Sequence, residues 1–155
     1  LDKETTRLFR EKNATLIPTV LAGKTVEKWA QDPKTFLTPN QVKKALEVGP
    51  QMQEMARIAY EAGVNIAFGT DTGVSKHGDN AQEFQYMIKA GMSEMEAIES
   101  ATTVAAKHFG MADKIGTLEK GKQADLIAVD GNPLDDISEL YDVDFVMKGG
   151  VVYKD

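Results

Sequence analysis

The feature that most constrains the fold is a short apolar run, Val64 to Phe68, that follows a helical pattern and stops at Gly69-Thr70-Asp71-Thr72-Gly73. Gly63 is the natural left-handed residue after a helix. A second β-branched run, Ala14 to Val20, precedes the helix. Strand, helix and strand in this order predict a parallel crossover unit and an α/β fold. Asp71 is then expected at the carboxyl end of a buried strand, where (β/α) barrels hold their chemical groups.

The first half of the chain carries two helix signals. Residues 2–12 predict a short amphipathic helix capped by Asp2. Thr38-Pro39-Asn40-Gln41 is a typical helix start, and Gly49-Pro50 should break or kink the helix that follows. Between these helices, Leu21 to Leu37 mixes Gly, Lys, Trp and Pro and predicts a long loop.

The second half changes character. Asn80 to Glu83 starts a helix that ends near Gly91, and a helix from Ser93 should run to about Phe109. After residues 111–118 the chain alternates Gly, charged residues and short apolar runs, which predict a small β-rich part with a hairpin turn at Gly149-Gly150. The expected strands are 124–129, 145–147 and 151–153.

Composition limits the function classes. The 155 residues are 42% hydrophobic and 27% charged, with a formal net charge of −6 and no Cys. Basic residues form no stripe, so nucleic acid is not an expected partner. No apolar stretch approaches the about 20 residues that span a bilayer. Because the chain begins at Leu1, we expect it to be a piece of a longer protein.

Several motifs in one order carry a family resemblance. Together they resemble the C-terminal part of the amidohydrolase superfamily, and especially its imidazolonepropionase-like and Xaa-Pro dipeptidase-like enzymes. The glycine-flanked acid and the later Gly-Lys-x-Ala-Asp-Leu run are the most specific elements. The motifs are Pro18-Thr19, Gly69-Thr70-Asp71, His77-Gly78, Glu83-Phe84, Ala90-Gly91-Met92, Ala101-Thr102 and Gly116 to Leu126.

The resemblance implies a fold and its division. Residues 1–112 would supply the last two βα units of a TIM-type (β/α)8 barrel, with 14–20 as strand seven and 64–68 as strand eight. Residues 113–155 would supply the C-terminal half of a small β-sandwich. The overall fold class is therefore expected to be α/β.

The resemblance also implies a chemistry. Such enzymes cleave amide-type C–N bonds of dipeptides or cyclic amides, with a metal-bound hydroxide as nucleophile and one or two divalent ions, of which zinc is the expected one. Their ligands are a His-x-His pair, a carboxylated Lys or Glu, two further His and a final Asp. Only the Asp, matching Asp71, is present, since the chain has two His in all. The chain alone is therefore expected to be inactive and to need a missing N-terminal half.

Asp71 and His77 are the candidate site residues. The resemblance implies that Asp71 is a metal ligand and proton shuttle; the alternative is a turn Asp that caps nearby backbone N–H groups. His77 would bind substrate, or it is a surface loop residue. Asn80 and Glu83 match the pattern of a capping box, which we favour over a substrate role.

Other candidates have structural interpretations. His108 suits the last turn of a helix, where a cation is favoured, and Trp29 is expected in the long loop. The methionines are expected in the core. Asp125, after the expected turn at Gly121-Lys122, should be structural.

A second function class stays open, a non-catalytic binding or structural module derived from a barrel half. Two barrel strands leave unpaired edges, which predict packing against the missing half or self-association. The substrate, a small molecule or dipeptide, the metal and the localisation stay undetermined at this stage.

Overall fold

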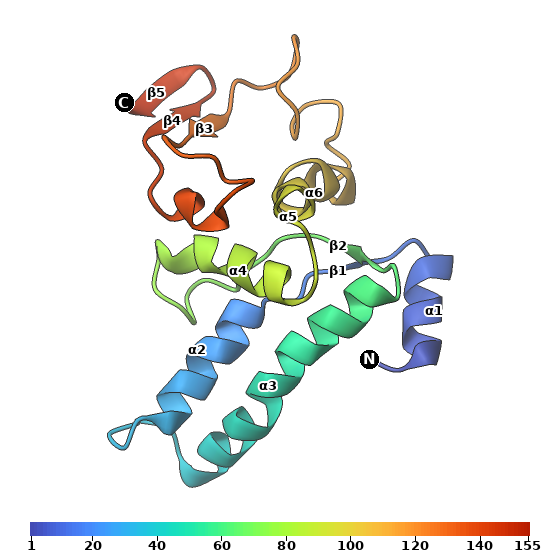
Figure 1. Ribbon diagram of the computed structural model, residues 1–155, viewed down its shortest axis with the longest axis vertical. Helices are drawn as coiled ribbons and strands as arrows, with labels where there is room; N and C mark the ends of the chain where they lie inside the picture. The colour runs from blue at the N-terminus through green and yellow to red at the C-terminus, as the bar shows by residue number, and fades with distance from the viewer.

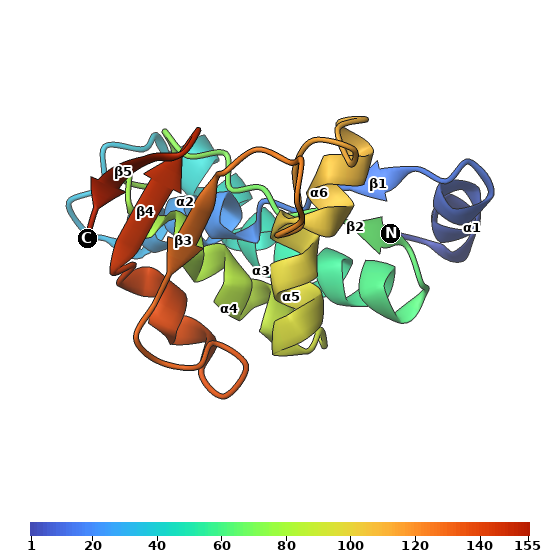
Figure 2. The same ribbon diagram turned by 90° about the horizontal axis from the view of Figure 1, so that it is seen from above.

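The computed structural model describes all residues 1–155 as a mixed α/β chain (Figure 1). Its helical part contains a two-stranded parallel sheet, and its C-terminal part a three-stranded antiparallel sheet. Figures 1 and 2 both place α1 and the antiparallel sheet at opposite ends of the molecule. The elements are α1 (Lys3–Glu11), β1 (Thr15–Leu16), α2 (Val20–Gln31), α3 (Pro39–Glu61), β2 (Asn65–Ile66), η1 (Asp79–Ala81), α4 (Gln82–Lys89), α5 (Glu94–Ala101), α6 (Thr103–His108), β3 (Leu126–Ala128), η2 (Ile137–Tyr141), β4 (Phe145–Lys148) and β5 (Val151–Lys154).

The parallel crossover is confirmed, although its strands are shorter than expected. Leu16 pairs with Ile66 in a parallel register, and β1 and β2 pair only with each other. Beyond the pairing, Ala67 N–H still donates to the carbonyl of Leu16, but Phe68 N–H donates to Ser100 of α5. Only two residues of each predicted strand therefore pair as strand, and the first prediction runs too far, since Val20 already belongs to α2.

The loop predicted for residues 21–37 is wrong, because most of it is the helix α2. Val20, Leu21 and Ala22 are buried, so the helix has an apolar face to pack. Gly23 misled the prediction, since glycine is a poor helix former. It lets α3 approach closely, because a Cβ at this position would lie 2.2 Å from the sulfur of Met52, which would then have to move.

The helix α3 begins as predicted and ends as predicted. Thr38 and Gln41 form a capping box, and Gly63 has a φ of 69° after the last turn. Of the break or kink predicted at Gly49-Pro50, the break is wrong, because a single helix runs through it, and the kink stays a prediction. Gly49 is buried against the side chain of Glu27, and packing of α2 along α3 supports both halves of the helix.

The other helices follow the sequence with one correction. Asp2 caps α1 by accepting from Thr5 N–H at 2.8 Å, and Ser93 forms a capping box with Glu96 at the start of α5. The helix predicted from Ser93 to Phe109 is two helices, because the backbone leaves the helical region at Thr102. This residue opens a β-branched stretch that disfavours helix.

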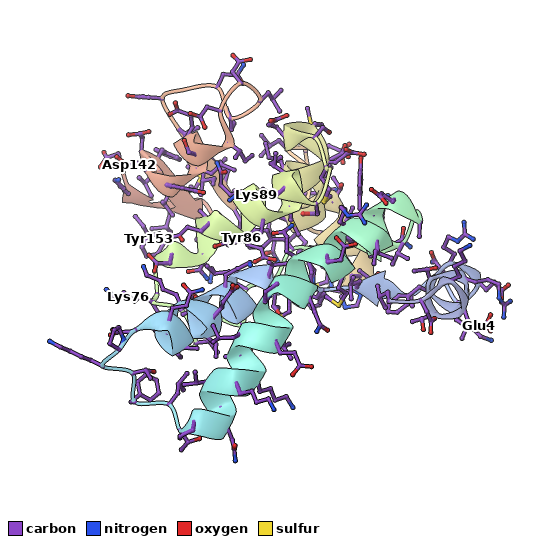
Figure 3. The ribbon with its side chains drawn as sticks, turned by 60° about the horizontal axis from the view of Figure 1, so that its bottom comes forward. Glu4, Lys76, Tyr86, Lys89, Asp142 and Tyr153 are labelled. Atoms are coloured by element: carbon purple, nitrogen blue, oxygen red, sulfur yellow. The ribbon has the colours of Figure 1, made fainter.

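The apolar core lies around the parallel pair. Its main cluster joins α3, β2, α4 and α5, and a smaller one joins α2, α3 and α4. Tyr86 of α4 packs on the smaller cluster, and Lys89 lies over its ring, with both side chains visible in Figure 3. The buried members are Ala59, Val64, Ile66, Met87, Met92 and Ala97 in the first cluster and Val20, Ala56 and Ala90 in the second.

The C-terminal sheet has the order β3-β4-β5, antiparallel throughout (Figure 2). The predicted turn is confirmed, since Gly149 and Gly150 have φ values of 57° and 78°. Asp125 accepts from Gly149 N–H at 2.6 Å and so fixes this turn, as its structural interpretation predicted. All four residues of β5 are exposed.

Candidate active site

Asp71 lies five residues after β2, in the segment that leaves the carboxyl end of the parallel pair. Its φ is 51°, which is uncommon for a residue other than glycine. Its side chain is exposed and accepts no hydrogen bond from the chain; only its carbonyl does, from Val74 N–H. The alternative of a turn Asp whose carboxylate caps local backbone groups therefore lacks the expected hydrogen bond.

A groove of about 430 Å³ runs between α2 and α3 and reaches Asp71. Its walls are mainly apolar, and its polar groups lie at the two ends, with Thr19 and Asp71 at the strand ends and Gln41 and Lys44 on α3. The other lining residues are Ala22, Gly23, Val26, Leu37, Ala45, Val48, Gly49, Met52 and Val74. An apolar groove that ends at an unengaged carboxylate suits an organic molecule with one reactive polar group.

The end of β1 is as unusual as the end of β2. Thr19 has a φ of 47°, and a β-branched residue in this region is a real outlier. Thr19 stands before the first turn of α2, but its side chain makes no capping hydrogen bond. Strained backbone of this kind persists where the surroundings determine it strongly, and it clusters at functional sites.

His77 lies in the same loop as Asp71, between β2 and η1. Its side chain is exposed, makes no hydrogen bond and is not among the residues that line the groove. Its substrate-binding role therefore stays a prediction.

The capping box predicted for Asn80 and Glu83 is wrong. Glu83 is fully buried and accepts from two backbone N–H groups of α2, Val20 at 3.0 Å and Leu21 at 2.6 Å. Asn80 donates instead to the hydroxyl of Thr72 at 2.7 Å. The Glu83 carboxylate thus caps the start of α2, where the side chain of the N-cap residue Thr19 makes no hydrogen bond. A negative group is favoured at a helix start.

Burial also changes the acidity of this group. Desolvation raises the pKa of Glu83 to about 7, although the hydrogen bonds from Leu21 and Val20 oppose the shift. The nearest charged groups on the neighbouring helix α2, Lys24 and Glu27, pair with each other at 2.8 Å. No cation therefore neutralises Glu83 directly.

Metal ligands do not cluster within this chain. No three His, Cys, Asp or Glu side chains converge anywhere in the structure. Asp71 is thus at most one ligand, whereas catalytic sites for metals such as zinc use about three protein ligands. None of the helices combines the length and apolar character needed to cross a membrane.

Two further candidates lie away from the groove. His108 is in the last turn of α6, as expected, with its ring beside Phe109. Trp29 lies in α2 rather than in a loop, and its ring packs on Phe36 at 5.3 Å between centroids. Both are therefore structural in this arrangement.

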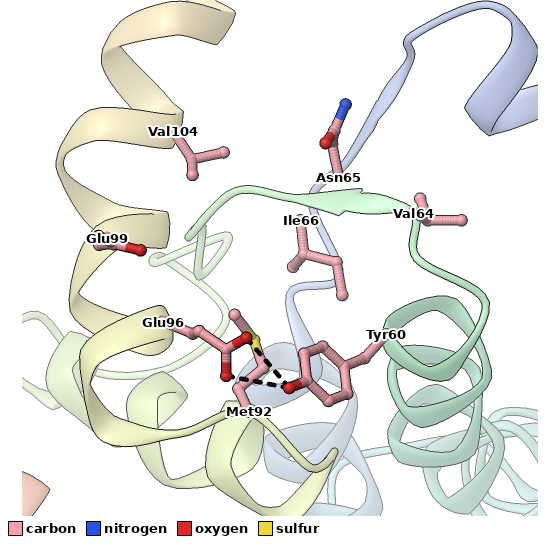
Figure 4. Close-up of a pocket in the computed structure, with 8 residues that line it drawn as sticks. All are labelled: Tyr60, Val64, Asn65, Ile66, Met92, Glu96, Glu99 and Val104. Atoms are coloured by element: carbon pink, nitrogen blue, oxygen red, sulfur yellow. Dashed lines mark hydrogen bonds between the residues drawn. The ribbon is translucent and has the colours of Figure 1, made fainter.

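A second, smaller pocket of about 170 Å³ lies at the other end of β2 (Figure 4). Tyr60 of α3 donates to Glu96 of α5 there, at 2.9 Å. The remaining lining residues are Val64, Asn65, Ile66, Met92, Glu99 and Val104. The Tyr60 hydroxyl and the Glu96 carboxylate thus already engage each other.

The roles of Thr19, Asn80 and Glu83 were missed from the sequence. A signal existed for one of them, because Glu83, Met87 and Ala90 share one helix face and the last two are apolar. An acid on an apolar stripe must be buried and needs donors. No local pattern identifies those donors, since they lie more than sixty residues earlier.

Comparisons of sequence place the chain among hydrolytic enzymes. The chain is 42% identical over 101 residues to the ochratoxinase of Aspergillus niger. This matched segment covers 62% of this chain and 21% of the relative. It is 37% identical over 84 residues to the imidazolonepropionase of Thermoanaerobacter pseudethanolicus, covering 52% of this chain and 20% of the relative. The chain thus spans about a fifth of the length of these relatives.

Structural comparison extends the similarity to the whole chain. A crystal structure of a Xaa-Pro dipeptidase with bound methionine in its active site superposes with a TM-score of 0.96 at 47% identity, over 100% of this chain and 38% of that one. The model of the Amidohydrolase family matches residues 1–153. The resemblance seen in the sequence is therefore confirmed, and the chain belongs to the amidohydrolase family.

Proposed function

We propose that this chain is part of a metal-dependent hydrolase that cleaves an amide-type C–N bond, with Asp71 as its reactive group. The observation that carries the proposal is the position of Asp71, at a strand end, with an unengaged carboxylate at the end of an apolar groove. Membership of a family that generally uses divalent metals supports it. The proposal applies to the complete gene product, because the chain spans 38% of the similar dipeptidase.

In this proposal residues 1–112 form the last two βα units of a (β/α)8 barrel, and residues 113–155 form half of a β-sandwich. Two observations support the division. The parallel strands β1 and β2 pair only with each other, whereas parallel sheets are normally buried within larger ones. The strand β5 is exposed along its length. Both sheets thus offer surfaces for the missing N-terminal half or, alternatively, for a second copy.

The proposed role of Asp71 is proton transfer. A carboxylate at this place can accept a proton from the attacking water and return it to the departing amine, which is general acid–base catalysis. The same carboxylate would be one ligand of a divalent metal, proposed to be zinc, with one or two ions in the complete protein. The other ligands must come from outside residues 1–155, because this chain offers no cluster of them.

The groove is the proposed place for the apolar part of the substrate. Its volume of about 430 Å³ and its mainly apolar walls suit an amino-acid side chain or a comparable ring. A dipeptide or cyclic amide whose scissile bond lies at Asp71 would extend along α2 and α3. His77, in the neighbouring loop, is proposed to contact the polar end of such a substrate.

The test is Asp71→Asn in the complete gene product, assayed against dipeptides that include Xaa-Pro and against N-acyl amino acids. Loss of the proton acceptor should lower kcat by about 10²- to 10⁴-fold. Asp113→Asn is the matched control, since Asp113 is exposed and makes no side-chain hydrogen bond. Turnover at the wild-type rate in Asp71→Asn would contradict the assignment.

The rival class is a non-catalytic module, favoured by the absence of a ligand cluster within the chain. The two classes differ in metal content. A hydrolase should bind a divalent ion as the complete gene product, measured by elemental analysis after gel filtration, and Asp71→Asn should reduce that content. A complete protein that binds no metal and cleaves none of the amides would favour the module.

A further inference from the structure

The loop that carries Asp71 is closed by a small network of side-chain hydrogen bonds. The hydroxyls of Thr70 and Thr72, which flank Asp71 on both sides, lie 2.7 Å apart. Asn80, at the far end of the loop, donates from its Nδ2 to Thr72 Oγ1 at 2.7 Å and to Thr70 Oγ1 at 3.3 Å. One carboxamide therefore contacts the residue before Asp71 and the residue after it.

The orientation of this carboxamide follows from its other contact. Gly78 N–H donates to Asn80 Oδ1 at 3.2 Å, and a backbone N–H can only donate. The Nδ2 group must then face the two threonines. Thr70 is 8% exposed, so this network is anchored on a buried side chain rather than on the surface.

The segment that contains Asn80 also makes a second contact with the rest of the fold. Glu83, three residues after Asn80, binds the N-terminal N–H groups of α2 at Val20 and Leu21. These residues follow Thr19, the other strained residue at the end of the groove. The start of α4 thus contacts both segments that leave the carboxyl ends of β1 and β2.

We propose that Asn80 is a positioning residue for Asp71, holding its positive-φ backbone through Thr70 and Thr72, and that Glu83 fixes this support to α2. The proposal rests on the proposed function of Asp71. This proposal explains why Asn80 and Glu83 have the pattern of a capping box but do not cap α4. Asn80 binds the loop of Asp71 instead, and Glu83 binds the start of α2. A loop held at both flanks keeps its central carboxylate in one place without contacting the carboxylate itself.

The main test is Asn80→Ala in the complete gene product. Residues that orient a catalytic group typically cost 10- to 100-fold in activity or metal affinity when removed. We expect kcat to fall by about 10- to 100-fold with KM changed by less than about threefold, since the groove walls are untouched. Asn132→Ala is the control, because Asn132 likewise donates from Nδ2 to a side chain and accepts a backbone N–H at Oδ1, but in a loop of the C-terminal part.

A second pair of variants separates positioning from folding. Thr72→Val removes the hydroxyl at nearly constant volume and should lower kcat in the same way, whereas Thr72→Ser keeps the hydroxyl and should restore most of it. The double variant Asn80→Ala/Thr72→Val should lose little more than either single one, since both act through one contact. Additive losses, or wild-type kcat in Thr72→Val, would overturn the proposal.

The outcome is distinguishable from failure of the proposed function. If Asp71→Asn is inactive while Asn80→Ala keeps wild-type kcat and metal content, Asp71 is catalytic and the positioning role is wrong. If both variants keep wild-type kcat, the function itself is wrong. If Asn80→Ala does not fold, Thr72→Val and Thr72→Ser decide the question alone.

Discussion

At the amino end of β2, Tyr60 and Glu96 join α3 to α5 by a direct hydrogen bond, whereas at its carboxyl end the Asp71 side chain makes no hydrogen bond at all. The backbone differs at one residue. Gly63 and Asn13 have positive φ at the amino end, and Asp71 and Thr19 at the carboxyl end. Gly, Asn and Asp tolerate this conformation, whereas Thr does so poorly.

Under the proposed function, this difference separates a stabilising end from the end that holds the catalytic carboxylate. At the amino end the Tyr60 hydroxyl and the Glu96 carboxylate are paired with each other across two helices. At the carboxyl end the buried side chains of Glu83 and Thr70 bind Val20 N–H and Asn80, respectively. The exposed carboxylate of Asp71 makes no hydrogen bond. Barrel enzymes show the same division, with chemistry at the carboxyl ends of the strands and stability at the other face.

The largest expected difference between the two ends is in how folding stability depends on pH. It is set by Glu83 at the carboxyl end and Glu96 at the amino end. The pKa of Glu83 is raised to about 7 by burial, from 4.5. Between these values the folded state binds a proton that the unfolded state has lost, so stability falls as pH rises from about 4.5 to 7 and is constant above. A shift of this size corresponds to about 3 kcal/mol.

Glu83→Gln tests this effect in the complete gene product. Unfolding midpoints measured between pH 4.5 and 8 should fall more with pH for the wild type than for the variant. Glu96→Gln is the contrasting control, because the hydrogen bond from Ser93 N–H lowers the pKa of Glu96 and places its effect at acid pH with the opposite sign. Parallel midpoint curves for the wild type and Glu83→Gln would contradict the difference between the ends.

Why Glu83 escaped prediction is clear from its comparison with Glu96. Ser93-x-x-Glu96 and Asn80-x-x-Glu83 have the same local pattern, yet only the first forms a capping box. Glu96 is half-buried and closes its capping box with Ser93 within one turn, in addition to accepting from Tyr60 of α3. Glu83 shares the buried face of α4 with Met87, and its partners come from α2. Local patterns determine exposed caps, whereas buried polar groups depend on the tertiary fold.

The same reasoning explains which elements could be predicted. The caps at Asp2, Thr38 and Ser93 and the turn at Gly149-Gly150 are local and were predicted. The helix α2 was not, because Gly23 lowers the helical signal and its role is set by Met52 of α3. The position of Asp71 at a strand end followed from the sequence, but the groove did not, since two separate helices form it.

The next effect concerns the groove of about 430 Å³ at the carboxyl end, which is larger than the pocket of about 170 Å³ at the amino end. Val48→Trp places a large side chain on the groove wall from a position that is 37% exposed, so the fold should tolerate it. For substrates with large apolar groups kcat/KM should fall about tenfold, and substrates with small groups should be affected less. A tenfold change equals about 1.4 kcal/mol, comparable to the loss of one or two buried methylene contacts.

Leu46→Trp is the matched control for the groove. Leu46 lies on the same helix, is 43% exposed and does not line the groove. Its kcat/KM values should match the wild type for large and small substrates alike. Equal losses in both variants, or no dependence on substrate size in Val48→Trp, would show that the groove does not receive the substrate.

The smallest effect is expected at the amino end, for Tyr60→Phe. The change removes the hydroxyl that donates to Glu96 and should lower stability only slightly, because a solvent-accessible hydrogen bond contributes little net free energy. The urea midpoint should therefore fall slightly, while kcat stays within about twofold because no catalytic group depends on this contact. Tyr153→Phe is the control, since Tyr153 is 71% exposed and its hydroxyl makes no hydrogen bond.

This variant decides whether the two ends are functionally distinct. The stability of a two-state domain and its turnover are independent quantities as long as the folded population stays near unity, so a small loss of stability should leave turnover unchanged. A fall in kcat comparable to that expected for Asn80→Ala would mean that the Tyr60–Glu96 contact reaches Asp71 through β2. The carboxyl end would then be held by the whole core, and not by the start of α4 alone.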